Sequence, residues 1–330
     1  MRLFDPQVIH ASWQRASTYG LADKSRQLHT IKLLRHVAAR GVMRVVHRPR
    51  NRAEALDHLR AAHPNFVRVI DAIDAELRLA EATRQPAVLP PLLLDGPPGC
   101  GKTFFAQHLA EFFGSGFVRV SMETAQTSAE LSGTAEHWSN SKPGRLFDQL
   151  LEGDFANPVF LLDEVDKAGG YESHRADKAL YGLLERESAK VWADSALPAL
   201  PMNASFVVWI LTSNDARKIA PPLRSRMQHF DIKALEGHAA RQMVRHIFRG
   251  QVEALPRLKF DAELPIAICD MLRWHSPREM ARLSRSLIAE AVKHHRSAVT
   301  VADLEATGAS DALIRALDQH FDARLEWTKQ

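Results

Sequence analysis

The eight residues from Gly96 to Thr103 constrain this chain more than any other stretch. They read Gly-Pro-Pro-Gly-Cys-Gly-Lys-Thr and fit the pattern G-x-x-x-x-G-K-[S/T] at every fixed position. The apolar run Leu92–Leu94 precedes them, and Phe104–Phe113, a stretch of helical character that Gly114 ends, follows. The sequence therefore predicts a buried strand, a glycine-rich loop and a helix in direct succession.

A loop of this kind can hold the phosphates of a nucleotide. The first turn of a helix has free backbone N–H groups and a positive dipole end, and glycines let the backbone approach an anion. In this pattern Lys102 reaches the β- and γ-phosphates, and the hydroxyl of Thr103 is a ligand of Mg²⁺. We expect ATP and Mg²⁺ as cofactors. The expected nucleotide contacts are Gly96, Pro97, Pro98, Gly99, Cys100, Gly101, Lys102, Thr103 and Phe104.

The segment Phe160–Glu164 is an apolar strand that ends in two acidic residues. A buried strand would deliver Asp163 to the sheet edge, where its carboxylate can hold Mg²⁺ directly or through water. Glu164 would then polarise the attacking water. A strand that runs into an ordinary polar turn has the same composition. Because one predicted strand separates this segment from the phosphate loop, the pattern favours a hydrolase over a passive binder.

Short apolar runs alternate with helical stretches from Val88 to about Leu235, which is typical of a parallel sheet in an α/β fold. The predicted strands are Leu92–Leu94, Phe117–Val120, Val159–Leu162, Phe206–Leu211 and His229–Ile232. Beyond them the pattern predicts helices only, at Ala239–Arg249, Leu264–Trp274, Arg278–Lys293, Asp303–Ala306 and Asp311–Leu325. We expect a three-layer P-loop domain over residues 63–234, a helical N-terminal segment over 1–62 and a small C-terminal helical lid domain over 235–330 with an extra last helix.

The motifs together resemble the AAA+ ATPases, and within them the ATPase module of the Lon protease family. Four segments carry the resemblance, which covers about residues 64 to 305: Gly96–Thr103, Phe117–Ser121, Asn157–Lys167 and Ala220–Met227. It implies that the 63–234 domain is an AAA+ domain. It also implies that the protein forms a homo-oligomeric ring, expected to be a hexamer, because one catalytic arginine of this family acts on the neighbouring subunit.

The resemblance assigns roles to three arginines and leaves one choice open. Arg226 aligns with the arginine finger that reaches the γ-phosphate of the neighbouring subunit, and Arg224 is the alternative. Arg278 aligns with the second sensor, an arginine of the lid domain that contacts nucleotide in its own subunit. An arginine delivered to a transferring phosphoryl group can raise the rate about 10³-fold or more.

Asn214 ends the predicted strand that follows Asp163 in the chain. An asparagine there can cap a turn, or its amide can orient the water beside the γ-phosphate. Its position at a neighbouring strand end favours the second interpretation, so we expect it to act with Lys102, Glu164 and Arg226 in hydrolysis.

The stretch Gly133–Arg145 is similar to the first pore loop of the Lon family. In that alignment Trp138 takes the place of the aromatic residue that grips a translocating polypeptide, and His137 lies beside it. The alternative, that Trp138 packs on its own domain, is the common fate of an aromatic side chain. The register of Pro143-Gly144-Arg145 favours the pore role.

The chain departs from the Lon pattern in two places. After Asp303 only a terminal helix is expected, so we expect no Ser/Lys protease site. Cys100 stands where a small residue is usual, which predicts sensitivity to thiol reagents.

The two cysteines offer no disulfide framework, and the longest apolar run, Phe206–Leu211, is too short for a bilayer. We therefore expect a cytoplasmic protein that does not contact membranes.

Positive charge is concentrated in residues 24–52, which hold nine Lys or Arg and no acidic residue. Without these nine the net charge of +4 becomes −5. Apolar residues at helical spacing, from Leu28 to Val37, predict a basic amphipathic helix here.

The main hypothesis is an ATPase that remodels or threads a polypeptide substrate, or passes it to a separate partner protein. The alternatives are a nucleic-acid ATPase, such as a loader or DNA-transaction factor that uses residues 24–52, and a slow nucleotide-switched scaffold.

Overall fold

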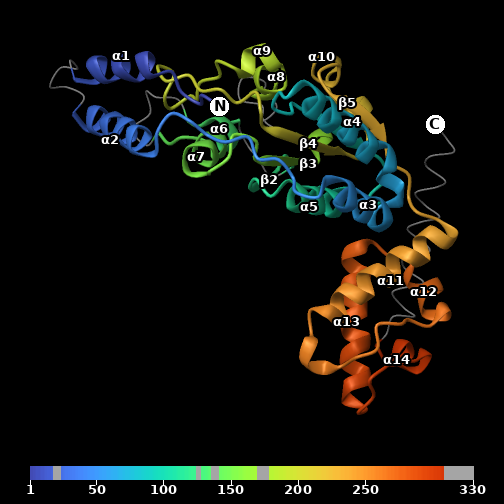
Figure 1. Cartoon of the computed structure of the whole chain (residues 1–330). Helices are drawn as coiled ribbons and strands as arrows, with labels where there is room; N and C mark the ends of the chain where they lie inside the picture. Colours follow the sequence, from blue (N-terminus) through green and yellow to red (C-terminus); the bar gives the residue numbers. More distant parts are fainter. Residues whose placement is uncertain (18–23, 124–127, 135–140, 169–177, 308–330) are drawn as a thin grey trace. The chain divides into compact units, whose positions relative to one another are not determined.

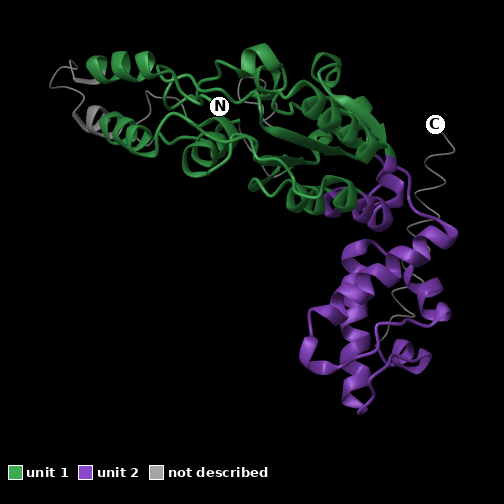
Figure 2. Cartoon of the chain, in the orientation of Figure 1, with its two compact units in different colours: residues 1–56, 68–95, 106–231 green, residues 57–67, 96–105, 232–330 purple. Residues whose placement is uncertain are grey.

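The computed structural model describes residues 1–17, 24–123, 128–134, 141–168 and 178–307. The chain forms two compact units, each assembled from separate segments (Figure 2). Unit 1 comprises Met1–Leu56, Arg68–Asp95 and Ala106–Asp231. Unit 2 comprises Asp57–Val67, Gly96–Phe105 and the chain from Ile232 onward, so the phosphate loop belongs to unit 2.

Unit 1 contains a five-stranded parallel sheet in the order β2-β3-β4-β1-β5 (Figure 1). The strands are β1 (Leu92–Asp95), β2 (Phe117–Ser121), β3 (Val159–Asp163), β4 (Val208–Ser213) and β5 (Gln228–Asp231). Because Asp95 pairs with Ser213 and Ser121 with Asp163, the carboxyl ends of the inner strands lie at one edge. This confirms the predicted α/β fold with a parallel sheet.

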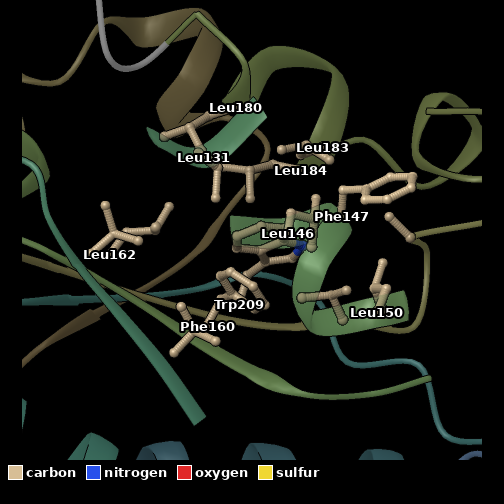
Figure 3. Close-up of a cluster of buried hydrophobic side chains, with 14 of the residues drawn as sticks. Leu131, Leu146, Phe147, Leu150, Phe160, Leu162, Leu180, Leu183, Leu184 and Trp209 are labelled. Atoms are coloured by element: carbon tan, nitrogen blue, oxygen red, sulfur yellow. The ribbon is translucent and has the colours of Figure 1, made fainter. Parts of the chain in front are cut away.

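Both faces of the sheet are buried. Strands β3 and β4 have no exposed residue, as expected for a parallel sheet covered on each side. Phe160 and Trp209 pack their rings 5.2 Å apart on one face (Figure 3). The residues that alternate with them, Leu161 and Ile210, point to the opposite face and are also buried. The fold therefore has the three layers that the sequence predicted.

Strand β4 begins two residues later than predicted. Phe206 and Val207 continue the apolar run, but the backbone N–H of Val207 donates to the carbonyl of Ala204 in a turn. The apolar run indicates which residues are buried, whereas the turn at its start decides which residue begins the pairing of β4 with its neighbouring strands.

Ten α-helices lie in the described part of the chain before Ile232. They are α1 (Pro6–Ser17), α2 (Lys24–Arg40), α3 (Arg52–Ala62), α4 (Val67–Thr83), α5 (Lys102–Phe113), α6 (Ala129–Ser132), α7 (Arg145–Glu152), α8 (Leu180–Leu183), α9 (Arg186–Ala189) and α10 (Pro221–Arg224). The sequence predicts α2 and α5 as helices and a helical segment over residues 1–62, but it does not predict α7. Phe4, just before α1, packs its ring against Phe147 of α7, 6.2 Å between centroids.

Four helices follow in the part of unit 2 that the structure describes: α11 (Gly237–Glu253), α12 (Ile266–Leu272), α13 (Pro277–Lys293) and α14 (Val301–Ala306). Their apolar faces form a separate core around Phe248, Leu272 and Leu287. Helix α13 begins with a capping box, in which Ser276 and Glu279 satisfy each other's backbone N–H groups. The helical lid is therefore as predicted over these residues, and the predicted last helix, Asp311–Leu325, lies outside the described residues.

Arginines of the basic segment bind the rest of unit 1. Arg44 is buried and donates from Nη2 to the Leu151 carbonyl at 2.6 Å and from Nε to the Gly153 carbonyl at 2.9 Å. It thereby caps the C-terminus of α7, where carbonyls lack helical partners. Arg52 pairs with Asp74 of α4 at 2.6 Å. These guanidinium groups have a structural use within the chain.

No helix in the described ranges combines the length and the apolar character needed to cross a membrane.

Candidate nucleotide-binding site

The glycine loop takes a conformation that needs glycine at particular positions. A Cβ atom added at Gly96 would lie 2.1 Å from the carbonyl oxygen of Ile232, which is far inside contact distance. Gly99 has φ +79°, in the left-handed region that favours glycine. Helix α5 then begins at Lys102, so the loop leads into a helix N-terminus as predicted.

The side chain of Lys102 lies against the loop itself. Its Nζ donates to the carbonyl oxygen of Gly96 at 2.6 Å and to that of Pro97 at 3.1 Å. The residue is 8% exposed, so the ammonium group is held close to the loop backbone. A buried ammonium with oxygen partners is a fixed positive charge, which suits a phosphate-binding loop.

Cys100 is a buried member of this loop. Burial raises the pKa of its thiol, and the nearby Lys102 ammonium opposes that change only in part. A thiol that is buried and protonated reacts slowly. The sensitivity to thiol reagents that the sequence suggested is therefore not expected of the folded protein.

Residues before the sheet also hold the loop, and sequence reasoning missed them. The Asn65 amide donates to the carbonyl of Cys100 and to that of Lys233, both at 3.0 Å. Phe66 stacks on Phe105 of α5 with centroids 4.2 Å apart. Nothing local in the sequence shows that the amide of Asn65 reaches a loop that is 35 positions away.

Within unit 2, the N-terminus of α13 lies next to the loop. A Cβ added at Gly99 would come 3.5 Å from Cβ of Ser276, and one added at Gly101 would come 3.6 Å from Cγ of Pro277. Arg278 follows directly and is exposed. The structure therefore places the predicted second-sensor residue on the helix end that borders the loop.

Asp163 is held from both neighbouring strands at the end of β3. The hydroxyl of Thr212 on β4 donates to Oδ1 at 2.5 Å. Arg119 on β2 donates to Oδ2 from Nη2 at 2.5 Å and from Nε at 3.1 Å. The residue is 5% exposed, so the carboxylate is buried and partnered at the predicted place.

Glu164 has an unusual backbone, with φ 60° and ψ 52° in the left-handed region. Non-glycine residues with this conformation cost energy and often occur at functional sites. Its backbone N–H donates to Oγ1 of Thr212 at 2.9 Å, and its carboxylate lies 3.1 Å from Nζ of Lys167. Glu164 and Glu123 raise the pKa of Lys167, whose ammonium bridges the two carboxylates.

Asn214 directly follows β4 in a turn that is tied to β1. Ser213 donates from its hydroxyl to Oδ1 of Asp95, and the backbone N–H of Ala216 donates to the same oxygen. The 3₁₀ turn η4 (Ala216–Lys218) is capped by Asp215. The predicted position of Asn214 at the carboxyl end of a strand is therefore correct, and Asp95 is a residue that sequence reasoning overlooked.

The two candidate finger arginines both have partners in their own chain. Nη1 of Arg226 donates to the carbonyl of Pro222, and the guanidinium lies 5.5 Å from the centroid of the Tyr181 ring. Nη1 of Arg224 donates to the carbonyl of Ala216 at 3.1 Å. Both residues are half-buried. The contacts within one chain do not distinguish Arg226 from Arg224, so both remain candidates for the arginine finger.

His137 and Trp138, the predicted pore-loop residues, lie outside the described residues. The residues on each side of them pair: the Thr134 N–H donates to the Lys142 carbonyl at 3.0 Å. Asp194 is fully buried, and its carboxylate accepts hydrogen bonds from the N–H groups of Gly144 and Ala196 at 2.9 and 2.8 Å. Burial raises the pKa of Asp194 to about 6.

Comparison with known proteins shows what this chain is similar to. Residues 92–234 match the family model described as ATPase family associated with various cellular activities (AAA). The structure of a RuvB mutant from Thermotoga maritima aligns with 73% of this chain and 68% of its own, at a TM-score of 0.50 and 16% identity. At that identity the likeness concerns the fold alone. Residues 92–234 are therefore similar to an AAA domain, and the fold is of the P-loop α/β type.

The curated relatives with similar sequences are Lon proteases. The Lon protease of Flavobacterium johnsoniae is 34% identical over 169 residues, which are 50% of this chain and 20% of that protein. Lon protease 1 of Bacillus subtilis is 29% identical over 224 residues, which are 65% of this chain and 29% of that protein. The chain thus spans less than a third of the length of these relatives. The comparisons confirm the predicted resemblance to the Lon ATPase region.

Proposed function

We propose that this protein is a Mg²⁺-dependent ATPase of the AAA+ type that forms a homo-oligomeric ring of six subunits and remodels or threads a polypeptide. The observation that carries the proposal is the place of Asp163 and Glu164 at the carboxyl end of β3. Asp95, the last residue of β1, lies at the same edge and directly precedes the glycine loop in the chain. A phosphate loop and a strand that ends in acidic groups are the two parts that nucleotide hydrolysis needs.

The residues fit a Mg²⁺ ion by the chemistry of their donor atoms. Mg²⁺ prefers hard oxygen ligands and usually takes one or two carboxylates together with substrate phosphates and water. Asp163 and Thr103 offer a carboxylate and a hydroxyl of this kind. The described residues contain no group of three or more His, Cys, Asp or Glu side chains that could hold a metal ion by themselves. When bound, the ion would neutralise charge on the phosphates.

Each proposed role follows from the chemistry of the side chain. Lys102 holds phosphate oxygens with a fixed positive charge, and Glu164 orients and deprotonates the attacking water. Asn214 hydrogen-bonds that water. Arg278 contacts the nucleotide of its own subunit. Arg226, or Arg224 in its place, reaches the nucleotide of the next subunit, which is why a ring is part of the proposal.

Part of the positive charge of the basic segment is engaged within the chain, which leaves less of it for a nucleic acid. A nucleic-acid surface needs arginines that are exposed and ready to bind phosphate. Arg44 is buried in a helix cap and Arg52 is paired with Asp74, so part of the positive charge is already used. His36 likewise lies 2.5 Å from Glu152. These contacts favour a role in holding the N-terminal helices on the AAA domain.

The first test separates hydrolysis from binding. Glu164→Gln should bind ATP with the affinity of the unaltered protein and hydrolyse it about 10²-fold to 10⁴-fold more slowly, because it lacks a base. Lys102→Ala should lose ATP binding. Binding is measured with a fluorescent ATP analogue and turnover by phosphate release. Turnover that survives Glu164→Gln would remove Glu164 from the mechanism.

The second test concerns the ring and the substrate. If the site is shared, mixing Arg226→Ala with Lys102→Ala should restore part of the turnover that each has lost, and Arg224→Ala serves as the matched alternative. ATP turnover should rise with an unfolded polypeptide and remain unchanged with DNA. Stimulation by DNA that falls steeply with salt would instead identify a nucleic-acid ATPase.

A further inference from the structure

We propose that Arg119 competes with the divalent cation for the carboxylate of Asp163, and that it thereby sets the Mg²⁺ concentration that the ATPase requires. The inference rests on the function proposed above. It adds a residue that belongs neither to the glycine loop nor to the acidic pair, and to which the sequence analysis assigned no role.

The register of the sheet explains why Arg119 reaches this carboxylate. Ser121 of β2 is paired with Asp163 of β3, and Arg119 stands two residues earlier on the same face of β2. Its long side chain extends along the strand, so that Nη2 and Nε both donate to Oδ2 of Asp163. On the other side Thr212 donates to Oδ1. The two neighbouring strands therefore engage different oxygens of one carboxylate.

The contacts at Oδ2 have a direct consequence for a metal ion. A carboxylate oxygen has about two lone-pair sites, and at Oδ2 two N–H groups of Arg119 point at them. A cation at that oxygen must displace at least one of these bonds. The guanidinium of Arg119 would also repel a divalent cation bound at Oδ2, because like charges within a few ångströms destabilise each other. Arg119 therefore acts as a counter-ion in place of the metal.

The exposure of the two partners shows which one can move. The side chain of Arg119 is 41% exposed, whereas that of Asp163 is 7% exposed. Arg119 can turn into solvent at little desolvation cost, and Asp163 cannot. The Arg119 carbonyl accepts a 2.7 Å hydrogen bond from Arg145, so the backbone stays fixed when the side chain leaves. The pair thus consists of a fixed carboxylate, that of Asp163, and a guanidinium that can be displaced, that of Arg119.

The test measures metal affinity rather than turnover. Mn²⁺ is titrated into the protein with ADP present, and free Mn²⁺ is followed by its paramagnetic resonance signal, with a protein-free blank for Mn²⁺·ADP. Arg119→Gln should bind Mn²⁺ about tenfold more tightly, since it removes a charge-assisted contact. Arg119→Lys, which keeps the charge but has no fork of donors, should lie between. Arg186→Gln removes the same charge from the exposed first residue of α9 and should stay within about twofold.

Affinity that is unchanged or weaker in Arg119→Gln would overturn the proposal, because a residue that only positions Asp163 would weaken metal binding when removed. If Arg119→Gln does not fold, the sign of the change in Arg119→Lys decides. The proposed function is tested separately by phosphate release from the unaltered protein. Tighter Mn²⁺ binding without any turnover would reject the ATPase function and keep the competition, and turnover without tighter binding would do the reverse.

Discussion

The hydroxyl of Ser213 donates a 2.5 Å hydrogen bond to Oδ1 of Asp95, and the backbone N–H of Ala216 donates to the same oxygen at 3.1 Å. Asp95 directly precedes the glycine loop, and Ser213 directly precedes Asn214. One carboxylate oxygen therefore joins the strand that carries the loop to the turn that carries the proposed water-orienting residue.

This junction predicts different effects for two substitutions of Asp95. Asp95→Asn keeps an oxygen acceptor for Ser213 and Ala216 and should retain most of the turnover. Asp95→Ala removes the acceptor, so the turn with Asn214 shifts, and kcat should fall about tenfold or more because small misplacements are costly in catalysis. Affinity for ATP should change less. The measurement is phosphate release as a function of ATP concentration, and equal losses in both variants would argue against a positioning role.

Asp194 predicts a pH dependence of stability. Its pKa in the folded protein is raised to about 6 by burial, whereas an ordinary aspartate titrates near 3.8. Between these values the folded state keeps a proton that the unfolded state has lost, so unfolding releases a proton and stability falls as pH rises. The loss amounts to about 3 kcal/mol once the pH is above 6. Asp194→Asn cannot show this loss.

The check is urea unfolding of both proteins between pH 4.5 and pH 7. The unaltered protein should lose its advantage over Asp194→Asn as the pH rises. Asn offers a single oxygen for the N–H groups of Gly144 and Ala196, so the variant should be less stable at the lowest pH. A difference between the two proteins that is constant with pH would contradict a raised pKa.

Arg44 predicts a stability effect in the basic segment. Arg44→Met leaves carbonyls of Leu151 and Gly153 without their buried donors, which should lower the free energy of unfolding by about 2 kcal/mol or more. The matched control is Arg48→Met, an exposed arginine whose contact to the Gln85 carbonyl is long, at 3.4 Å. Chemical denaturation measures both. Equal stability of the two variants would show that the helix cap contributes little.

The cysteines predict slow labelling of the folded protein. Burial raises the pKa of both Cys100 and Cys269, so little thiolate is present at neutral pH. Iodoacetamide should react with neither in native buffer and with both in urea. Cys269→Ser isolates the signal of Cys100. Rapid loss of that thiol in native buffer would mean that the loop opens often.

The motif pattern was sufficient to predict the sheet and the residues at its edge. The alternation of short apolar runs with helices identified every strand found among the described residues, and Asp163 and Asn214 lie at strand ends as expected. Such features are local, because a phosphate loop and a strand that ends in acids are each contiguous in the chain.

The partners of those residues could not be predicted in the same way. Arg119 reaches Asp163 only through the register of two strands, and Asn65 reaches the loop across 35 positions of the chain. Helix α7 was missed because it is short. Helix α1 was covered only by the general prediction of a helical segment over residues 1–62, because the periodicity of its own residues is weak. In each case the deciding contact joins residues far apart in the sequence, which no local pattern reports.

The packing of Phe4 against Phe147 has a consequence for how this protein should be divided. The first residues of the chain share one hydrophobic core with strands β3 and β4, through Leu3, Phe4, Leu34 and Val37. The family match begins only at Leu92. A fragment cut at that boundary would expose the apolar surface that these side chains cover, so homology marks the start of the shared motif and not the start of the folding unit.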